Sequence, residues 1–227
     1  MIESMPSAGA SNLASRPYRP RDRAAIRDIC AATASCGRPA PDCVGDEWIW
    51  AEFWTRYFTD REPRHTWVVE DPSRGRVVGY LTGTADARRA ETYAPFLLPG
   101  VIWRVIRRRL LRRPVARRAL RGLARSLLAG ELDVPARMLR RYPATLHIDL
   151  LPPAQGCGLG RELFRVYVGA MRSLGVPGVH AQSLSVNHAV ARFNERVGFR
   201  LVRTTPLHAF AHIDGHPIGV HTWLMTL

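Results

Sequence analysis

The chain has 227 residues, 46% of them hydrophobic, which suits one globular domain with an embellishment. No apolar run approaches the roughly 18 residues of a membrane span, and the four cysteines lack the Cys-x-x-Cys spacing of a metal site. The formal net charge is +14, and all 33 basic side chains are arginine, so lysine self-acetylation is excluded. The N-terminus lacks the layout of a signal peptide, which together with reduced cysteines predicts a cytoplasmic protein.

The first part of the chain predicts a short strand and a helix after a disordered start. Residues 1–14 are small and polar, so we expect disorder there and a folded domain over residues 15–227. Residues 15–19 can form a short strand. Residues 21–32 predict a helix that turns Ala25, Ile26 and Ile29 inward.

An aromatic helix is expected over residues 46–58. Trp50, Phe53, Trp54 and Tyr57 share one helical face there. Two interpretations stay open: the rings form an apolar wall for a ligand, or they only bind the helix to a sheet, as aromatic stripes usually do.

A hairpin and then a strand-free segment come next. Residues 65–70 and 76–82 alternate like two strands around a turn. Residues 86–143 contain 15 arginines and four acidic residues, so this segment holds +11 of the net charge. It has no strand pattern and predicts an inserted basic helical hairpin.

The hairpin itself is expected over residues 101–128. Apolar residues recur at helical spacing over 101–113, and Pro114 is placed to start a second helix. Its arginines form either the solvated face of an amphipathic lid or a contact with something anionic, such as tRNA or lipid headgroups. Only Trp103 lies among them, so base stacking by interleaved aromatics is not favoured. We expect the lid, with its apolar face docked on the domain.

A glycine-rich turn joins the next strand to a helix. Residues 145–151 alternate like a strand, with His147 and Asp149 on one face. The turn Gln155-Gly156-Cys157-Gly158-Leu159-Gly160-Arg161 follows, and a helix then runs to Gly175. A helix N-terminus that begins in such a turn presents backbone N–H groups and the positive end of the helix dipole. The turn therefore predicts an anion site that needs no lysine.

The C-terminal part predicts a strand, a helix and a hairpin. Residues 179–185 read as a strand, and Asn187 can cap a helix that Gly198 ends. Residues 206–213 and 217–227 flank the hairpin signal Asp214-Gly215. His208 and His212 lie four residues apart, about 13 Å along a strand, which is too far for one metal ion. We therefore expect no metal.

The Gln-x-x-Gly-x-Gly spacing of Gln155, Gly158 and Gly160 resembles the acetyl-CoA loop of the GCN5-related N-acetyltransferases (GNAT). The family's second motif matches in register at Asn187, Phe193, Gly198 and Phe199, but Asn194 stands where the family has tyrosine. The tract from Gly175 to His180 also resembles bacterial acetyltransferases related to the acetyltransferase-like domain of O-GlcNAcases.

The resemblance implies a fold and an activity. The fold is α/β (α+β), with a mixed, mostly antiparallel sheet of about seven strands flanked by helices and with the basic insertion at about residues 86–143. The activity is transfer of an acetyl group from acetyl-CoA to an amine of a small molecule or peptide, by direct attack in a ternary complex. Two alternatives stay open: an aminoacyl-tRNA-dependent transferase, or a catalytically inactive acyl-CoA-binding domain. A nucleic acid partner is not favoured, and a monomer or homodimer is expected.

The resemblance also implies site residues. The amine must lose a proton, for which Asp149 is our first choice of base and His147 the second. Backbone N–H near Leu150 or Leu151 would steady the oxyanion. Asn194 cannot be the general acid that the family's tyrosine is, so water or Tyr167 would take that role.

The 3′-phosphate of CoA is a further anion that the arginine hairpin would suit. Acceptor contacts are assigned to Trp50, Trp54 and Tyr57. The residues expected around the cofactor are Leu150, Leu151, Gln155, Gly156, Cys157, Gly158, Leu159, Gly160, Arg161, Asn187 and Phe193.

Overall fold

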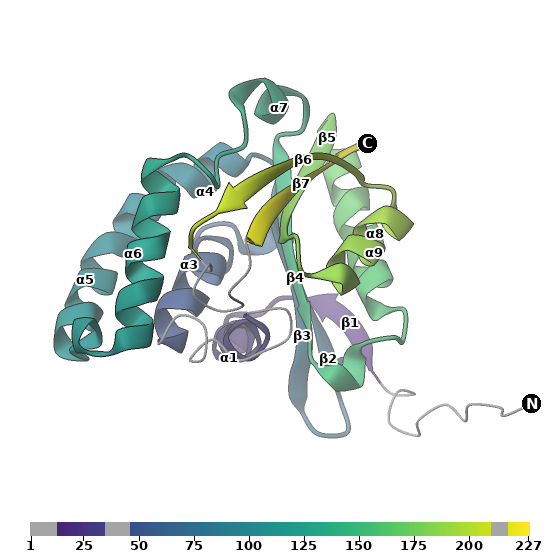
Figure 1. Ribbon diagram of the computed structural model, residues 1–227. Helices are drawn as coiled ribbons and strands as arrows, with labels where there is room; N and C mark the ends of the chain where they lie inside the picture. The colour runs from purple at the N-terminus through teal and green to yellow at the C-terminus, as the bar shows by residue number, and fades with distance from the viewer. Residues whose placement is uncertain (1–12, 35–45, 210–217) are drawn as a thin grey trace, which may run out of the picture.

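The computed structural model describes residues 13–34, 46–209 and 218–227. The described strands form one seven-stranded sheet in the order β1-β2-β3-β4-β5-β7-β6 (Figure 1). Only β4 and β5 pair in parallel, so the predicted mixed, mostly antiparallel sheet is confirmed. The strands are β1 (Ala14–Pro17), β2 (Thr66–Asp71), β3 (Arg76–Thr84), β4 (Ala144–Leu150), β5 (Gly178–Leu184), β6 (Arg200–Leu207) and β7 (Ile218–Thr226).

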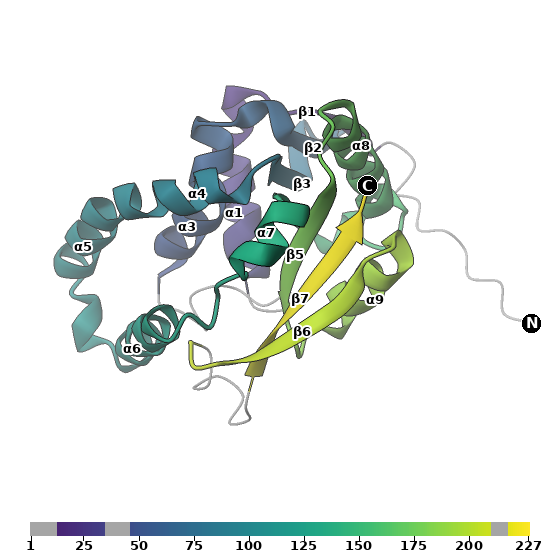
Figure 2. The same cartoon turned by 90° about the horizontal axis from the view of Figure 1, so that it is seen from above.

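Helices cover both faces of this sheet. Helices α8 and α9 lie on one side and α1 and α3 on the other, while α5 and α6 stand further out beyond α3 (Figures 1 and 2). The helices are α1 (Arg23–Thr33), α3 (Glu47–Asp60), α4 (Ala87–Tyr93), α5 (Leu98–Arg107), α6 (Pro114–Leu128), α7 (Ala136–Arg141), α8 (Leu159–Ser173) and α9 (His188–Val197). Residues 85–143, all of which are described, contain helices and no strand, as predicted.

The alternation of β4 divides its side chains between two cores. Leu146, Ile148 and Leu150 pack into the cluster that α8 completes. The opposite face of the sheet gives Val68 and Tyr80 to a second cluster with Ile26 of α1. Successive strand residues point to opposite faces, so His147 and Asp149 lie on the α1 side.

Strands β4 and β5 part soon after they meet. They pair only at Ala144 with Val179 and at Thr145 with His180, whereas β5 continues along β7 to Leu184. The edge of β4 from 146 to 150 therefore has no ladder partner on the β5 side among the described strands. Backbone groups on that edge remain available to a ligand.

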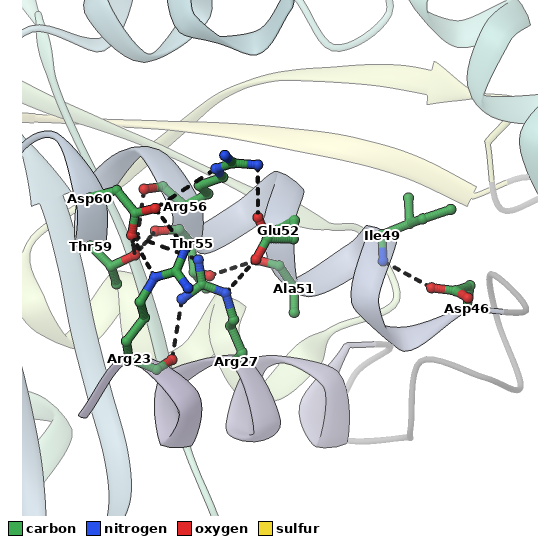
Figure 3. A network of polar contacts seen from close by, with 10 residues as sticks. All are labelled: Arg23, Arg27, Asp46, Ile49, Ala51, Glu52, Thr55, Arg56, Thr59 and Asp60. Atoms are coloured by element: carbon green, nitrogen blue, oxygen red, sulfur yellow. Dashed lines mark hydrogen bonds and ion pairs between the residues drawn. The ribbon is translucent and has the colours of Figure 1, made fainter. Parts of the chain in front are cut away.

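Ion pairs hold α1 against α3 (Figure 3). Arg23 makes two hydrogen bonds to the carboxylate of Asp60, at 2.8 and 2.7 Å, and Arg27 Nε lies 2.5 Å from Oε1 of Glu52. Asp46 caps α3 by accepting a hydrogen bond from Ile49 N at 3.1 Å. The network fixes the aromatic face of α3 relative to α1.

The inserted segment differs from its prediction at one helix. The expected helix over residues 101–113 begins earlier, at Leu98, and ends at Arg107, because Arg109 adopts a left-handed conformation with φ of 50°. A short 3-10 turn, η4 (Leu110–Arg112), then leads to α6, which starts at Pro114 as predicted. Helix α6 docks through Ala116, Ala119 and Ser126, whereas every residue of α5 is described and none is buried. The expectation that both helices of the hairpin dock on the domain through their apolar faces is therefore wrong for α5.

The ends of the chain bring one further correction. Strand β6 starts at Arg200, six residues before the predicted start. The predicted disordered start lies outside the described residues except Leu13 and Ala14, and Ala14 already belongs to β1. The expected turn at Asp214-Gly215 also lies outside them. Within the described part of the chain, no helix has the length and apolar character to span a bilayer.

Candidate functional site: an open glycine turn beside a buried carboxylate

The glycine turn leads directly into α8. Gly156 and Gly158 have positive φ angles of 75° and 82°, and Gly158 is the N-cap residue of the helix. A Cβ atom at either position would meet nothing within 4 Å. These glycines are therefore required by backbone conformation, and the space in front of them is open. The Gln155 side chain donates a hydrogen bond to Leu150 O at 2.7 Å, which ties the turn to the end of β4.

Three elements converge behind this turn. A Cβ atom on Gly160 would lie 3.3 Å from Cδ1 of Leu150 and 3.5 Å from Cε2 of Phe193. Leu159 is buried in the core, so its side chain serves packing. Asn187 caps α9 by accepting a hydrogen bond from Val190 N at 3.1 Å, whereas Cys157 and Arg161 are exposed. The turn, β4 and α9 thus meet at one place.

The two backbone groups predicted to steady an oxyanion differ in availability. Leu151 N donates to Val78 O at 2.9 Å, so this N–H is already engaged. Successive N–H groups of a strand point to opposite edges, so the N–H of Leu150 points to the edge that β5 leaves. Leu150 is therefore the one of the two that can meet a ligand.

Asn194 is buried in α9 with an unsatisfied donor. Its Nδ2 atom is inaccessible to solvent and has no hydrogen-bond partner among the described residues. A buried donor without a partner costs on the order of 1–3 kcal/mol.

Asp149, His147 and Tyr80 form one hydrogen-bonded group on the α1 side of the sheet. The Tyr80 hydroxyl donates to Asp149 Oδ2 at 2.7 Å and lies 3.0 Å from Nδ1 of His147. A phenol has one proton, so the imidazole donates to the phenol oxygen when the carboxylate accepts. Nε2 of His147 is then the nitrogen that can accept a proton, and it lies 3.6 Å from Asp149 Oδ2.

Burial sets the charge of this group. It raises the pKa of Asp149 above the ordinary carboxyl value, although nearby His147 and hydrogen bonds from Tyr80 and Thr33 oppose the shift. About 20% of the Asp149 side chain still reaches solvent, so a substrate can approach it. Burial also raises the pKa of the Cys30 thiol to about 12, with the charge of Asp149 adding to the shift. The pKa of Asp149 is therefore closer than that of an exposed aspartate to the value that suits a base at neutral pH.

A metal-type donor set exists here. Ligand atoms of Cys30, His147 and Asp149 all lie within 4.8 Å of one another. The Tyr80 hydroxyl, however, bonds to both Asp149 and His147. Zinc at bonds of about 2.0–2.3 Å would have to displace that hydroxyl and draw the ligands together. The arrangement fits a proton network better than a metal centre.

The aromatic face of α3 lies partly over this group. The ring of Trp54 stacks on His147 with centroids 5.3 Å apart, and Trp50 lies 5.7 Å from Trp54. The indole nitrogen of Trp54 is buried without a partner among the described residues. Tyr57 instead donates to Glu62 Oε2 at 2.7 Å. Trp50 and Trp54 are therefore beside the candidate base, and Tyr57 belongs to a separate polar network.

Tyr167 and His208 both have hydrogen-bond partners of their own. The Tyr167 hydroxyl donates to Thr145 O at 2.9 Å inside the core, where burial raises its pKa well above the ordinary value, so it is no acid for a leaving group. His208 bonds to Glu131, and His212 lies outside the described residues. Sequence reasoning missed Tyr80 and Cys30, whose only signals are an alternating strand and a helical apolar face.

No protein-family model matches the chain. Among solved structures, SsHAT is 30% identical over 95% of this chain and 98% of its own, with a TM-score of 0.68. Drosophila melanogaster polyamine N-acetyltransferase, which forms N-acetylagmatine, is 17% identical over 95% of this chain and 100% of its own, with a TM-score of 0.61. The structure of yncA from Salmonella typhimurium with its cofactor acetyl-CoA is 16% identical over 96% and 95%, with a TM-score of 0.56.

Proposed function

Because the chain belongs to the GCN5-related N-acetyltransferases, we propose that it transfers the acetyl group of acetyl-CoA to an amine of a small molecule or peptide in a ternary complex. The observation that carries the proposal is the open glycine turn at the start of α8, next to the unpaired edge of β4. Acetyl-CoA supplies an activated acyl group, and the chain supplies binding, orientation and proton acceptance.

The turn suits the cofactor's phosphates. The first N–H groups of α8 have no partner within the helix, and the helix dipole favours an anion there. Gly156 and Gly158 leave room for close approach to the backbone. The N–H of Leu150 is placed to stabilise the oxygen on which charge develops during transfer. These groups fit acetyl-CoA without a lysine.

Proton acceptance is assigned to the Asp149 group. An ordinary alkyl amine has a pKa near 10.4 and attacks only as the free base. Asp149 accepts the proton. Tyr80 holds the carboxylate in place through the hydrogen bond at 2.7 Å, and His147 orients the Tyr80 hydroxyl through the contact at 3.0 Å. His147 Nε2 is the second acceptor. His147 stacks on Trp54, so the amine would approach beside the aromatic face of α3.

Asn194 takes a different role from the family's tyrosine. Its buried Nδ2 group can donate a hydrogen bond to the sulfur or carbonyl oxygen of the thioester, but an amide cannot protonate the leaving thiolate. The pKa of a free thiol is near 8.5, so water suffices as the proton source at neutral pH.

The test is an acceptor screen that follows release of free thiol from acetyl-CoA. Wild type should release thiol with at least one amine among polyamines, amino acids and short peptides. Asp149→Asn should lower that turnover about 10²–10⁴-fold with little change in acetyl-CoA affinity. Near-normal turnover would remove Asp149 as the base, and an equal loss in His147→Ala alone would assign the base to His147.

The same experiment distinguishes amine acetylation from the two alternative functions. Acetyl-CoA binding without turnover on any amine would favour a catalytically inactive acyl-CoA-binding domain. No acetyl-CoA binding, with transfer from an aminoacyl-tRNA, would favour the tRNA-dependent alternative, which the arginines of residues 86–143 would suit.

A further inference from the structure

The apolar face of α5 points away from the protein. Leu98, Ile102 and Ile106 recur every four residues and are 55%, 56% and 70% exposed. Trp103 lies next to them on the helix and is 58% exposed. At 100° per residue these side chains form one continuous arc. Exposed apolar patches of this kind mark an interaction site more often than scattered exposed residues do.

The opposite side of α5 is the one that touches the protein. Arg104 hydrogen bonds to both carboxylate oxygens of Asp46, at 2.8 and 2.9 Å, and lies over the ring of Trp48. A Cβ atom on Gly100 would be 3.4 Å from the same ring. Helix α5 therefore faces the protein with Gly100, Arg104 and two half-buried valines, Val101 and Val105. Its larger apolar side chains are the exposed ones, unlike those of an ordinary surface helix, whose apolar stripe faces the core.

The outward face is held in place and extended by the turn that follows it. Arg109, with its left-handed backbone, reverses the chain, and Leu110 then anchors the turn in the interior at 1% exposure. The next residue, Leu111, is by contrast 58% exposed. Figures 1 and 2 show α5 at the outer edge of the molecule, remote from α8 and α9.

Positive charge borders this apolar arc, and the segment that supplies it has no acidic residue of its own. Residues 98–128 contain ten arginines and no aspartate or glutamate. Five of them surround the end of α5, and all five are exposed: Arg107, Arg108, Arg109, Arg112 and Arg113. Arg107 also lies 4.9 Å above the ring of Trp103. An exposed aliphatic face with tryptophan and a rim of arginine is the composition of a helix that lies in a membrane interface.

We propose that the surface formed by Leu98, Ile102, Trp103, Ile106, Leu111 and these five arginines docks on an anionic lipid membrane. Complementary charge decides the occupant. Nucleic acid would use the arginines but leave the aliphatic residues in water. A second copy in a symmetric contact would bring arginine against arginine with no acidic partner in the segment. A membrane with acidic headgroups satisfies both halves of the surface, and this inference does not depend on the proposed enzymatic function.

Vesicle sedimentation with the full chain tests the proposal. Wild type should bind phosphatidylcholine vesicles that contain phosphatidylglycerol and bind pure phosphatidylcholine weakly. Replacing Arg107, Arg108, Arg112 and Arg113 with Gln should lower the partition coefficient about 100-fold or more, because each basic residue near an anionic surface contributes roughly fivefold. The matched control removes four exposed arginines elsewhere, Arg165, Arg172, Arg196 and Arg200, and should keep most of the binding.

A second variant tests the apolar half. Ile102→Ser with Ile106→Ser should also release the protein from vesicles, whereas the control Leu174→Ser, which removes a 54% exposed leucine of another surface, should not. Trp103 fluorescence should be quenched by brominated lipid, and Trp103→Phe should abolish that part of the quenching. The substituted residues are exposed, so we expect every variant to fold, and circular dichroism checks this.

Three results would overturn the proposal. Wild type that fails to bind anionic vesicles contradicts it directly. Binding that survives both the arginine and the isoleucine variants assigns lipid contact to another surface. If vesicle binding is absent, two further observations reassign the surface. Sub-micromolar binding of tRNA or duplex that the arginine variant loses would assign it to nucleic acid. A dimer that dissociates in the isoleucine variant would assign it to a second copy of the chain.

Discussion

The Tyr80 hydroxyl opposes the effect of burial on the pKa of Asp149. Burial raises the pKa of Asp149, and the hydrogen bond from Tyr80 opposes that rise. A base must be deprotonated to act, so with Asp149 as the proposed base we expect activity to fall as pH drops through the pKa of Asp149 in the folded protein. Tyr80→Phe removes a bond to the charged form, which raises this pKa further.

The predicted result for Tyr80→Phe is a shift of the acidic limb of the kcat/KM profile toward higher pH, with activity largely recovered above it. The measurement is the pH dependence of thiol release at saturating acetyl-CoA. An unmoved acidic limb in a folded variant would show that the titrating group is not Asp149.

Asn194 should trade stability of the free protein for cofactor affinity. Replacing its unsatisfied buried amide with leucine, which is close in size, removes a cost on the order of 1–3 kcal/mol. We therefore expect Asn194→Leu to melt at a higher temperature and to bind acetyl-CoA about tenfold more weakly, the loss of one hydrogen bond. Calorimetry of both properties is the check. A destabilised variant with unchanged affinity would contradict the assignment.

Among the residues around Asp149, some could be identified from the sequence and others could not. His147 and Asp149 stand out because two polar residues alternate on a strand that ends in a glycine turn. Tyr80 does not, because its contact depends on the register that pairs it with Asp149 across β3 and β4. Cys30 and Thr33 join from α1, and only tertiary packing brings them there.

At the scale of elements, α6 is attached to the domain through a glycine. A Cβ atom on Gly122 would lie 2.7 Å from His208 O and 3.0 Å from Ala209 O, both backbone atoms. The buried Ser126 hydroxyl, which accepts from Ala209 N at 2.9 Å, holds the same contact. The helix therefore cannot approach this part of the chain so closely with any larger residue at position 122.

Gly122→Ala should destabilise the protein by about 1–3 kcal/mol, because the backbone contact must open. Gly169→Ala is the matched control: Gly169 lies in α8 with nothing within 4 Å of an added Cβ, so alanine should stabilise by about 0.5–1 kcal/mol. Urea unfolding of both variants is the measurement. Equal stabilisation by both would show that α6 does not need the close approach.

Most elements follow from the sequence, and the exceptions have physical reasons. Pro114, Gly175 and Gly198 mark helix ends that the structure confirms. Residues 108–113 read as helix because arginine and leucine both favour it, but Arg109 turns left-handed where Leu110 enters the interior. Strand β6 starts earlier than the sequence predicts because it is an edge strand, mostly exposed until Leu207, and lacks an alternating apolar pattern.

At the scale of the whole molecule, β4 joins the two halves of the proposed site. Its even-numbered residues, Leu146 to Leu150, face α8 and the glycine turn, and His147 and Asp149 face α1 and α3. The parting of β5 opens the edge between these two faces. Acetyl-CoA bound at the turn and an amine beside Trp54 would therefore meet across one strand.

The most direct test of this account is calorimetric titration with acetyl-CoA. Gly158→Glu places a side chain and a negative charge at the N-terminus of α8, so binding should be lost or weakened by 100-fold or more, that is by about 3 kcal/mol. Gly175→Glu is the control, since Gly175 has a similar positive φ of 67° and open surroundings at the other end of the same helix, and it should bind like wild type. Wild-type affinity in folded Gly158→Glu would contradict the assignment of the cofactor to this turn.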